Sequence, residues 1–452
     1  MTVATRAPRR VLIIVQNLPV PLDRRVWLEC QALAAQGYTV SVICPKGPGD
    51  PAFQEIDGVA IYKYKPAPDA KNLRGFVLEF VLSWLRTARL SLKVRRQRGF
   101  DVIQACNPPD TYWLLALLWR SRGVRFVFDQ HDLNPELFLS RFGRPRSAGQ
   151  RAQFRGLLWL ERMTYRVADR VISTNGSYRG IALTRGKRDA ATVTVVRSGP
   201  DTRAMRPVYP PDDTRAGAKH VLVYLGIMGP QDGVDFIIDL VNELVRTRGR
   251  NDLKAVLMGF GDCLEELKAR TTELGLDDYI RFTGRVGPQQ IAHYLSAADV
   301  GISPDLKTPL NNISTMNKTM EYMAYALPSV SFDLVETRVS AGDAAILVPS
   351  GDLDAFATAV EGLLDDPAER ARMGASARRR VSAELDWQPQ AQAYVTVFDE
   401  LLNNPPDAAR LAAWPFAPRD ADAYPPTAGQ LVDLDNVAEF DRFIIERSSP
   451  TG

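Results

Sequence analysis

The sequence is poor in the residues that most often bind metals or carry redox chemistry. It contains 3 histidines and 4 cysteines among 452 residues. The cysteines at 30, 44, 106 and 263 have neither metal-ligand nor redox-motif spacing, and the first two lie within apolar segments. They are typical of small core residues in a reducing compartment. We therefore expect neither a metal site nor a resident cofactor.

Long apolar runs are also absent from the sequence. The first run, at 11–15, is too short for the core of a signal peptide and is followed by no cleavage site. The longest other run, at 112–119, is too short to span a bilayer. The sequence thus predicts a cytoplasmic location, with room for peripheral attachment to the inner face of the cell membrane.

The glycine motif of dinucleotide-binding proteins, Gly-x-Gly-x-x-Gly, does not follow the first apolar strand. A dinucleotide-dependent dehydrogenase is therefore disfavoured. What the chain does contain is a regular alternation of apolar strand patterns and helix patterns. Strands are expected at 11–15, 39–44, 101–105, 125–128, 170–173 and 192–196, with helices between them, and a second series starts at 220. This alternation predicts parallel sheets covered by helices.

The length suits two domains, and the composition suggests where they divide. We predict an N-terminal domain at 1–205 and a C-terminal domain at 206–386, with the Pro-rich segment 206–219 as linker. A helix at 387–403 is expected to pack back toward the N-terminal domain. Residues 404–452 are rich in Pro, Ala and Asp and are predicted to be mostly disordered, with a short element possible only at 431–445.

Charge is distributed unevenly along the chain. Residues 1–200 carry 32 Lys and Arg against 15 Asp and Glu, whereas the remainder carries 24 against 38. A basic half implies an anionic partner, and nucleic acid is disfavoured because no binding module is recognisable. The segment 76–97 predicts an amphipathic helix that would suit an anionic membrane surface. A helix that packs on the core and exposes a basic face fits the same residues equally well.

The segment 311–332 is the strongest candidate for a binding site. It predicts a polar loop, a short helix at 318–326 and a strand at 329–332. A helix N-terminus offers unpaired N–H groups to a phosphate, and Lys318 in its first turn adds a full charge. Glu321 is three residues further and lies on nearly the same face. The alternative interpretation is a surface Lys–Glu pair on an ordinary helix.

The order of several motifs resembles that of family 4 glycosyltransferases over roughly residues 10–402. The motifs are RVWLECQALAAQGYTVSVICP (25–45), FDQHDLNPELF (128–138), YLGIMGPQDGVD (224–235), LMGFGD (257–262), FTGRV (282–286) and NKTMEYMAYALPSV (317–330). The resemblance implies the GT-B fold, an α/β architecture of two Rossmann-like, doubly wound domains that face each other across a cleft. It also implies a nucleotide-sugar donor bound by the C-terminal domain.

In this family the residue that matches Glu321 binds the ribose hydroxyls. The resemblance further implies that the backbone of Gly226 and Gly229 lies close to the diphosphate. It also implies that Arg285 and Val286 contact the nucleotide base. Asn317 and Lys318 begin the same donor-binding helix. His131 matches a histidine that the family places beside the transferred sugar. The alternative for His131 is a loop histidine that caps a turn with Asp132.

Three positions depart from the family pattern. Ile227 and Asp232 stand where the family usually has Arg and Lys, and Ile313 stands where it has the first of two glutamates. Lys318 is our replacement for the missing cation, and an N-K-x-x-E helix also occurs in family 4 members that build bacterial surface polysaccharides. His131 and Lys318 are therefore the predicted catalytic residues.

The acceptor is expected on the N-terminal domain. Asn17, Arg24 and Arg25 follow the first strand, where arginines could meet the phosphate of a lipid carrier. Asn134 and Glu136 could bind acceptor hydroxyls. The alternative for the arginines is an ordinary helix start with solvated side chains.

The function these features favour is a retaining transfer of a hexose from a nucleotide-sugar to a lipid-linked or surface-glycan acceptor. Retention is implied by the resemblance alone. Two alternatives remain open: a nucleotide-sugar epimerase, which needs no acceptor, and a catalytically silent partner that has kept the fold.

Overall fold

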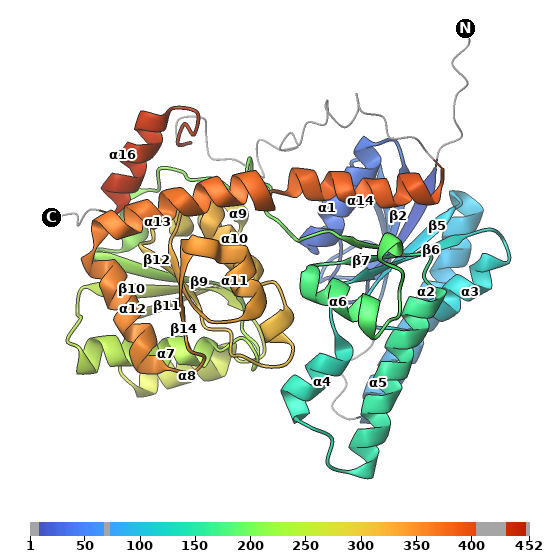
Figure 1. Cartoon of the computed structure of the whole chain (residues 1–452), viewed down its shortest axis with the longest axis horizontal. Helices are drawn as coiled ribbons and strands as arrows, with labels where there is room; N and C mark the ends of the chain where they lie inside the picture. The colour runs from blue at the N-terminus through green and yellow to red at the C-terminus, as the bar shows by residue number, and fades with distance from the viewer. Residues whose placement is uncertain (1–8, 67–72, 404–430, 449–452) are drawn as a thin grey trace, which may run out of the picture. The chain divides into compact units, whose positions relative to one another are not determined.

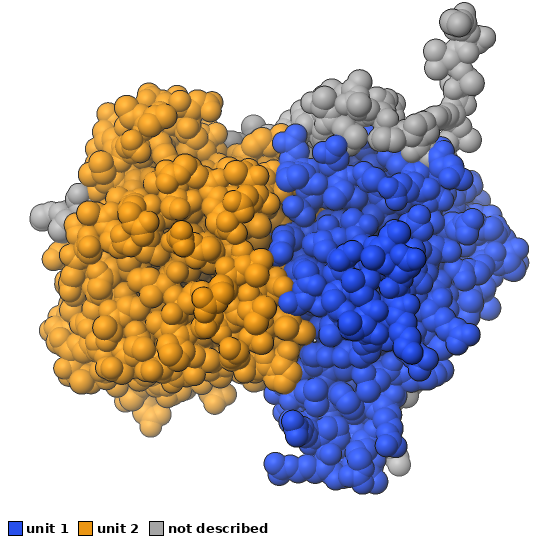
Figure 2. All heavy atoms as spheres, viewed as in Figure 1, with its two compact units in different colours: residues 1–198, 388–415 blue, residues 199–387, 416–452 orange. Residues whose placement is uncertain are grey.

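The computed structural model describes residues 9–66, 73–403 and 431–448. The chain divides into two compact units, coloured separately in Figure 2. Unit 1 comprises residues 1–198 and 388–415, and unit 2 comprises residues 199–387 and 416–452. The Pro-rich segment 206–219 lies wholly within unit 2, so the prediction that it links the domains is wrong. The predicted boundary after residue 205 also falls inside unit 2.

Unit 1 is built on an eight-stranded sheet in the order β3-β4-β2-β1-β5-β6-β7-β8. All neighbouring strands are parallel except the pair β3 and β4. The central strands are buried on both faces, which explains their continuous apolar sequences. Their bounds are Arg10–Ile14 (β1), Thr39–Pro45 (β2), Phe53–Ile56 (β3), Val59–Tyr64 (β4), Val102–Cys106 (β5), Arg125–Gln130 (β6), Arg170–Ser173 (β7) and Val193–Val195 (β8).

Helices cover both faces of this sheet (Figure 1). A core under one face joins strand residues to apolar residues of α2, α3 and α5. The bounds of the helices in unit 1 are Arg24–Ala35 (α1), Leu73–Gln97 (α2), Trp113–Arg120 (α3), Asn134–Phe142 (α4), Ala148–Val167 (α5) and Gly176–Thr184 (α6).

The helix α14, Trp387–Leu401, packs within unit 1 although it follows unit 2 in the sequence. The hydroxyl of Tyr38 donates to Asp399 at 2.6 Å, and the ring of Tyr38 meets Phe398 edge-on. The hydroxyl of Tyr394 donates to Gln104 of β5 at 2.6 Å. These contacts hold α14 against the sheet of unit 1.

Unit 2 contains a six-stranded sheet in the order β11-β10-β9-β12-β13-β14, parallel throughout. One core lies among the strands and α7, α8 and α12, and another among the strands, α9 and α10. Both units are therefore doubly wound α/β layers, as predicted. The strands are His220–Ile227 (β9), Leu253–Phe260 (β10), Ile280–Gly284 (β11), Val300–Ser303 (β12), Ser329–Phe332 (β13) and Ala345–Val348 (β14).

The helices of unit 2 follow the strands in regular alternation. Their bounds are Val234–Asn242 (α7), Leu264–Glu273 (α8), Pro288–Ala297 (α9), Asn317–Ala324 (α10), Val335–Ala341 (α11), Leu353–Asp365 (α12) and Pro367–Arg380 (α13). Beyond α14, residues 431–448 are ordered against unit 2 and include the helix α16, Val437–Ser448. The rest of the predicted disordered tail, 404–430 and 449–452, lies outside the described residues.

Among the residues that the structure describes, no helix combines the length and the apolar character needed to cross a membrane.

Candidate functional site

Helix α10 carries the residues predicted to hold the donor. It begins at Asn317, one residue earlier than predicted, and in the described chain no side chain caps its N-terminus by a hydrogen bond. The first N–H groups of a helix have no partner within the helix, so this end suits an anion. Every residue of α10 except Asn317 is buried. A helix buried on all sides is held rigidly by its surroundings.

Lys318 forms a buried ion pair at the start of α10. Its Nζ lies 2.6 Å from Oδ1 of Asp305, which follows β12, and Oδ2 of Asp305 accepts a hydrogen bond from Ser303 at 2.7 Å. Lys318 is 8% exposed and Asp305 is 2% exposed. Although burial favours the neutral amine, the charge of Asp305 raises the pKa of Lys318. The cation predicted to meet a diphosphate is thus fully charged and already positioned by a carboxylate.

Gly226 lies beside this lysine. A Cβ atom at Gly226 would stand 2.8 Å from the hydroxyl oxygen of Tyr224 and 3.3 Å from Cε of Lys318. Nζ of Lys318 also lies 5.1 Å from the ring centroid of Tyr224, in the range of a cation–π contact. The structure therefore brings together two of the predicted donor residues, Gly226 and Lys318.

Gly229, in the loop after β9, is held by the acid that replaces the family's lysine. Its N–H donates to Oδ2 of Asp232 at 2.9 Å. The same loop is fixed by Asn311, whose Nδ2 donates to the carbonyl of Gln231 at 3.1 Å. At Gly229, where a close approach of the diphosphate to the backbone was predicted, the N–H thus already has a carboxylate acceptor.

The other predicted donor residues lie on α10 and after β11. Glu321 is 6% exposed, one turn after Lys318. The guanidinium of Arg285 lies 5.7 Å from the ring centroid of Phe260, and Phe260 pairs with Ile227 in the sheet. Since Ile227 adjoins Gly226, the ends of β9 and β10 place Arg285 near the glycine loop. Val286 is partly buried against the core that includes residues of α9 and α10.

In unit 1, His131 directly follows β6 and is paired with Asp129. Nε2 of His131 lies 2.7 Å from Oδ2 of Asp129. The two residues are two apart at the end of a strand, a spacing that places side chains on the same face. Although burial favours the neutral ring, the charge of Asp129 raises the pKa of His131. The imidazole therefore keeps a second proton to a higher pH than an ordinary histidine.

Arg25 is the cation of the same cluster. Its guanidinium lies 3.0 Å from Asp129, 3.0 Å from Glu29 and 3.2 Å from Nε2 of His131. It also donates to the carbonyl of Val196 and the hydroxyl of Ser198. We predicted that Arg25 binds an acceptor phosphate. The structure instead engages its donors inside unit 1, where they contact the charged Asp129 and the buried side chain of Glu29.

Glu29 completes this network from the next turn of α1. Its side chain is wholly buried, and burial together with the neighbouring charge of Asp129 raises the pKa of Glu29 to about 8. Gln104 of β5 bridges the acids, because its Nε2 donates to Glu29 at 2.7 Å and to Asp129 at 3.0 Å. Tyr394 of α14 in turn donates to Gln104.

Four potential metal ligands converge here, which the sequence spacing did not predict. Ligand atoms of Glu29, Cys106, Asp129 and His131 all lie within 4.8 Å of one another. The guanidinium of Arg25 contacts three of them, Glu29, Asp129 and His131, and places a positive charge within the cluster.

Asn107, in the loop after β5, fixes the loop that carries His131. Its Oδ1 accepts hydrogen bonds from the backbone N–H of His131 at 2.8 Å and of Asp132 at 3.1 Å. Its Nδ2 donates to Asp110, which also accepts from Asn134 at 2.5 Å. Burial raises the pKa of Asp110 to about 7. Asn134, predicted to bind acceptor, is thus bonded to a buried acid.

The remaining acceptor candidates differ in their exposure. Both oxygens of Glu136 accept from Arg185, at 2.6 and 2.9 Å, so this carboxylate is part of an internal ion pair. Asn17 and Arg24 are exposed, and Arg24 lies in the first turn of α1, whose N-cap is Asp23. Of the predicted acceptor residues, these two are the ones presented to solvent.

Sequence reasoning missed several residues that organise the two clusters. Asp305, Asp129, Glu29 and Asn107 were not singled out. The signals for two of them were local: Arg25 and Glu29 have the (i, i+4) spacing of a helical ion pair, and Asp129 is two residues before His131. The pairing of Lys318 with Asp305 has no such local signal.

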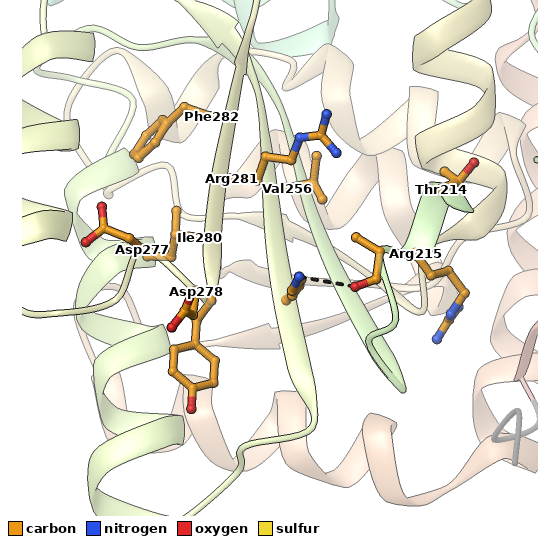
Figure 3. Close-up of a pocket in the computed structure, with 11 residues that line it drawn as sticks. Thr214, Arg215, Val256, Asp277, Asp278, Ile280, Arg281 and Phe282 are labelled. Atoms are coloured by element: carbon orange, nitrogen blue, oxygen red, sulfur yellow. Dashed lines mark hydrogen bonds between the residues drawn. The ribbon is translucent and has the colours of Figure 1, made fainter. Parts of the chain in front are cut away.

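A surface cavity of about 410 Å³ lies along the edge strand β11 and its neighbour β10 (Figure 3). Its lining includes Arg281, Phe282, Asp277 and Thr214. None of the residues predicted to bind donor lines it. Nζ of Lys254 donates a hydrogen bond to the carbonyl of Ala216, and Arg215 donates one to Asp299. These two cations therefore stabilise the fold of unit 2.

Comparisons with known proteins agree with the fold. A family model described as "Glycosyl transferase 4-like domain" matches residues 22–199, and one described as "Glycosyl transferases group 1" matches residues 219–366. A D-inositol 3-phosphate glycosyltransferase of Kineococcus radiotolerans is 27% identical over 398 residues, which are 81% of this chain and 87% of that protein.

Solved structures show the same architecture. Sucrose-phosphate synthase of Thermosynechococcus elongatus superimposes with a TM-score of 0.70 at 19% identity, over 87% of this chain and 99% of that one. HepE of Anabaena, in complex with UDP-glucose, gives a TM-score of 0.63 at 17% identity, over 86% and 99% of the two chains.

Fold and family matches together define a glycosyltransferase of the GT-B class, and the predicted fold class is confirmed. Within that class the chain belongs to the family 4 type, as its motifs predicted. It is a hexosyltransferase that takes its sugar from a nucleotide-sugar donor.

Proposed function

We propose that this chain is a retaining hexosyltransferase whose acceptor is lipid-linked or part of a surface glycan. The observation that carries the proposal is the buried Lys318–Asp305 ion pair at the start of α10, beside Gly226. An ammonium group next to the first N–H groups of a helix offers a diphosphate both charge and hydrogen-bond donors. HepE of Anabaena, which has the same fold, was solved in complex with UDP-glucose, and this supports a nucleotide-sugar as the donor.

In the proposed reaction the bond between C1 of the hexose and the diphosphate breaks, and its electron pair passes to the phosphate oxygen. The acceptor hydroxyl forms the new bond to C1 on the same face and gives its proton to the departing phosphate. Lys318 and the N–H groups of α10 stabilise the developing charge, while Glu321 binds the ribose hydroxyls. A separate side-chain base is then unnecessary.

His131 is proposed to contact the transferred hexose. Asp129 holds Nε2, so a doubly protonated ring donates a hydrogen bond to a sugar hydroxyl from Nδ1. This role requires the raised pKa of His131 and is weakened when Asp129 loses its charge. Arg25 and Glu29 are proposed to set the charge of Asp129 rather than to touch substrate.

The proposal uses no resident metal or cofactor, because Lys318 and the helix N-terminus neutralise the leaving group. Transfer rates are therefore expected to be unchanged by EDTA. Loss of activity that Mg²⁺ restores would instead assign part of the neutralisation to a metal ion.

We also propose that unit 1 lies against an anionic membrane, where a lipid-linked acceptor is found. Helices α2, α3 and α5 form one continuous layer, since Trp119 donates to Ser91 at 3.2 Å and the rings of Trp113 and Trp159 meet edge-on. The outer side of this layer is both apolar and basic. Its exposed side chains include Leu85, Leu92, Leu117, Leu118 and Trp159, with Arg89, Arg96, Arg120, Arg122, Arg155 and Arg162 among them.

Both interpretations of the helix at 76–97 describe part of α2. Its inner side packs on the core of unit 1 through Val94, Trp84 and Leu90. Its outer side exposes Leu85 at 53% and Leu92 at 49% as well as arginines. A basic face that contacts only water would not be expected to carry exposed leucines. The combination of exposed leucines and arginines on one face of α2 therefore supports the membrane proposal.

The anomeric configuration of the product tests the retaining mechanism directly. Wild-type chain is incubated with UDP- and GDP-hexoses and a membrane lipid extract, and the early product is analysed by proton NMR. We expect the configuration of the donor to be kept, and an inverted product contradicts the proposal. A changed sugar on the nucleotide in the absence of acceptor would identify an epimerase instead.

A further inference from the structure

The C-terminal segment, residues 431–448, packs against the C-terminal end of α10. The helix α16 places Phe440, Phe443 and Ile444 on one face, at i, i+3 and i+4. This face meets α13 and joins Ala326, just beyond α10, in a small apolar core. In Figure 1, α16 lies beside α13 in unit 2. The segment lies outside the residues matched by both family models.

The start of the segment is fastened to unit 2 as well. Leu431 pairs with Val208 in an antiparallel bridge, and the N–H of Val432 donates to the carbonyl of Pro207 at 3.3 Å. Further along, the rings of Tyr209 and Phe443 meet edge-on at 5.8 Å. Both ends of the segment are therefore attached to the same unit as α10.

Arg447 reaches the end of α10 directly. Its guanidinium donates to the carbonyl of Tyr325 at 2.9 Å and to the carbonyl of Ala326. Ala326 has a left-handed backbone, with φ of 55°, which ends the helix. The last carbonyls of a helix lack partners within it and carry partial negative charge, so an arginine here satisfies both needs.

Two other contacts enclose the same turn. Arg378 of α13 donates to the carbonyl of Ala324 at 2.7 Å. A Cβ atom at Gly374 would lie 2.2 Å from the carbonyl oxygen of Ala326, so α13 approaches this turn as closely as glycine allows. The end of α10 is thus held from two helices, and Arg447 is the contribution of the C-terminal segment.

The use of a charged side chain here is costly. Burial lowers the pKa of Arg447 to about 10, and the residue is 9% exposed. If the side chain served only to fill space, an apolar residue would do so without the free-energy cost of removing a charge from water. The guanidinium instead forms directional hydrogen bonds with two backbone carbonyl oxygens.

We infer that Arg447 is a positioning residue for the donor, and that the C-terminal segment sets the place of Lys318 and Glu321 by holding the far end of α10. The inference rests on the proposed donor role of α10. At 8 residues this helix is about 12 Å long and moves as one rod. A shift at its carbonyl end therefore displaces the ammonium and the carboxylate at its other end.

The test is calorimetric titration of the full chain with ADP, GDP, UDP and dTDP, comparing wild type with Arg447→Met and Arg447→Lys. Methionine keeps the length of the side chain but removes its donors, and lysine restores one charged donor. Arg442→Met is the control, because Arg442 is exposed on the same helix. Calorimetry reports Kd and stoichiometry separately, so misfolding lowers the stoichiometry of binding without changing Kd.

We expect Arg447→Met to weaken binding about tenfold at unchanged stoichiometry, a smaller effect than the roughly 100-fold loss of rate that a 1 Å misplacement can cause. Arg447→Lys should recover part of the loss, and Arg442→Met should match wild type. An unchanged Kd for Arg447→Met, or a loss confined to stoichiometry, overturns the inference.

Failure of the donor site itself gives a different pattern. If wild type binds none of the four nucleotides, or if Lys318→Met binds them as well as wild type, the donor role of α10 is wrong and the inference falls with it. If Lys318→Met loses binding while Arg447→Met keeps it, the donor site stands and the positioning role alone is refuted.

Discussion

Oδ2 of Asp129 lies 2.7 Å from Nε2 of His131. The other oxygen of the same carboxylate lies 3.0 Å from Arg25. Although burial opposes ionisation, Arg25 and His131 lower the pKa of Asp129, so this acid is charged throughout the physiological range. The proton state of His131 is thus decided by a residue that need not touch substrate.

Replacing Asp129 by Asn should therefore impair transfer while keeping the shape of the side chain. Without the carboxylate, the pKa of His131 falls toward its ordinary value, and the protonated form is lost at lower pH than in wild type. We expect kcat to fall about 10- to 100-fold at neutral pH, because the hydrogen bond from a charged donor to the sugar is lost, and the pH profile to move to lower pH. Steady-state kinetics between pH 5 and 9 measures both.

Asp101→Asn is a suitable control for that variant, because Asp101 pairs with Arg10 elsewhere in unit 1. An Asp129→Asn enzyme with the rate and pH profile of wild type would show that the Asp129–His131 pair has no part in transfer.

Glu29 should make stability depend on pH. In the folded chain it keeps its proton to about pH 8, whereas an exposed glutamate ionises near 4.5. The folded state therefore binds the extra proton between these values, so the stability it contributes is lost as pH rises from about 5 to 8. In Glu29→Gln the drop in Tm over this interval should be smaller by several degrees.

Thermal unfolding of the two proteins across this pH range measures the effect. Glu265→Gln, which alters an exposed acid, should unfold with the slope of wild type. Equal slopes for Glu29→Gln and wild type would mean that Glu29 is ionised in the folded chain.

The Lys318–Asp305 pair allows binding and stability to be separated. Lys318→Met leaves the Asp305 carboxylate buried without its cation, and Asp305→Asn leaves the ammonium without its anion. Each should reduce the free energy of unfolding by about 3 kcal/mol, while the double variant should recover most of that loss. Donor binding should fail in both variants that lack Lys318 and persist in Asp305→Asn.

Denaturant unfolding and nucleoside diphosphate titration of the three variants give the two readouts. Additive destabilisation in the double variant would show that the two side chains do not depend on each other. Donor binding by the double variant would remove Lys318 from the site.

The mixed face of α2, α3 and α5 should bind anionic vesicles. We expect the chain to sediment with phosphatidylglycerol vesicles, less so at 0.5 M salt than at about 0.1 M, because surface charges are screened. Arg89→Glu with Arg96→Glu should reduce the bound fraction severalfold, and Leu117→Ser with Leu118→Ser should reduce it at both salt concentrations.

Arg379→Glu with Arg442→Glu is the matched control, because it makes the same charge change at exposed positions of unit 2. Vesicle binding that responds equally to both charge reversals would indicate a nonspecific effect of net charge rather than a membrane-binding face.

The sequence predicted most of the central strands because they are buried on both faces. The predicted strands at 170–173 and 329–332 coincide with β7 and β13. The strands β3 and β4 were missed for a physical reason. β3 alternates exposed and partly buried residues, and β4 buries Lys63, whose charge is satisfied by Asp50 at 2.6 Å. A lysine paired across a loop cannot be distinguished from a solvated lysine in the sequence.

The candidate site was predictable where it depends on local order and not where it depends on tertiary pairing. The position of Lys318 and Glu321 on one short helix followed from the pattern of 311–332, and α10 has that place. The partner of Lys318, thirteen residues earlier, depends on how the loop after β12 folds back. Arg25 was predicted to meet an acceptor phosphate, whereas its place in the first turn of α1 directs it toward Asp129 and Glu29.

The C-terminal segment shows the same limit. Its composition predicted a mostly disordered tail, since charged and small residues outnumber large apolar ones. Phe443 and Ile444 suffice for α16 to pack, because α13 offers small residues, including Ala371 and Ala375, as a surface. That complementarity is a property of two distant segments and is invisible in either alone.

The central claim is that the N-terminal end of α10 binds the nucleotide-sugar donor. The most direct test measures how fast the full chain releases nucleoside diphosphate from nucleotide-sugars. UDP- and GDP-hexoses are supplied with a membrane lipid extract, and wild type is compared with Lys318→Met and Glu321→Gln. We predict turnover by wild type, a fall in kcat/KM of about 100-fold for Lys318→Met, and a raised donor KM for Glu321→Gln. Turnover by both variants at the wild-type kcat/KM would contradict the account.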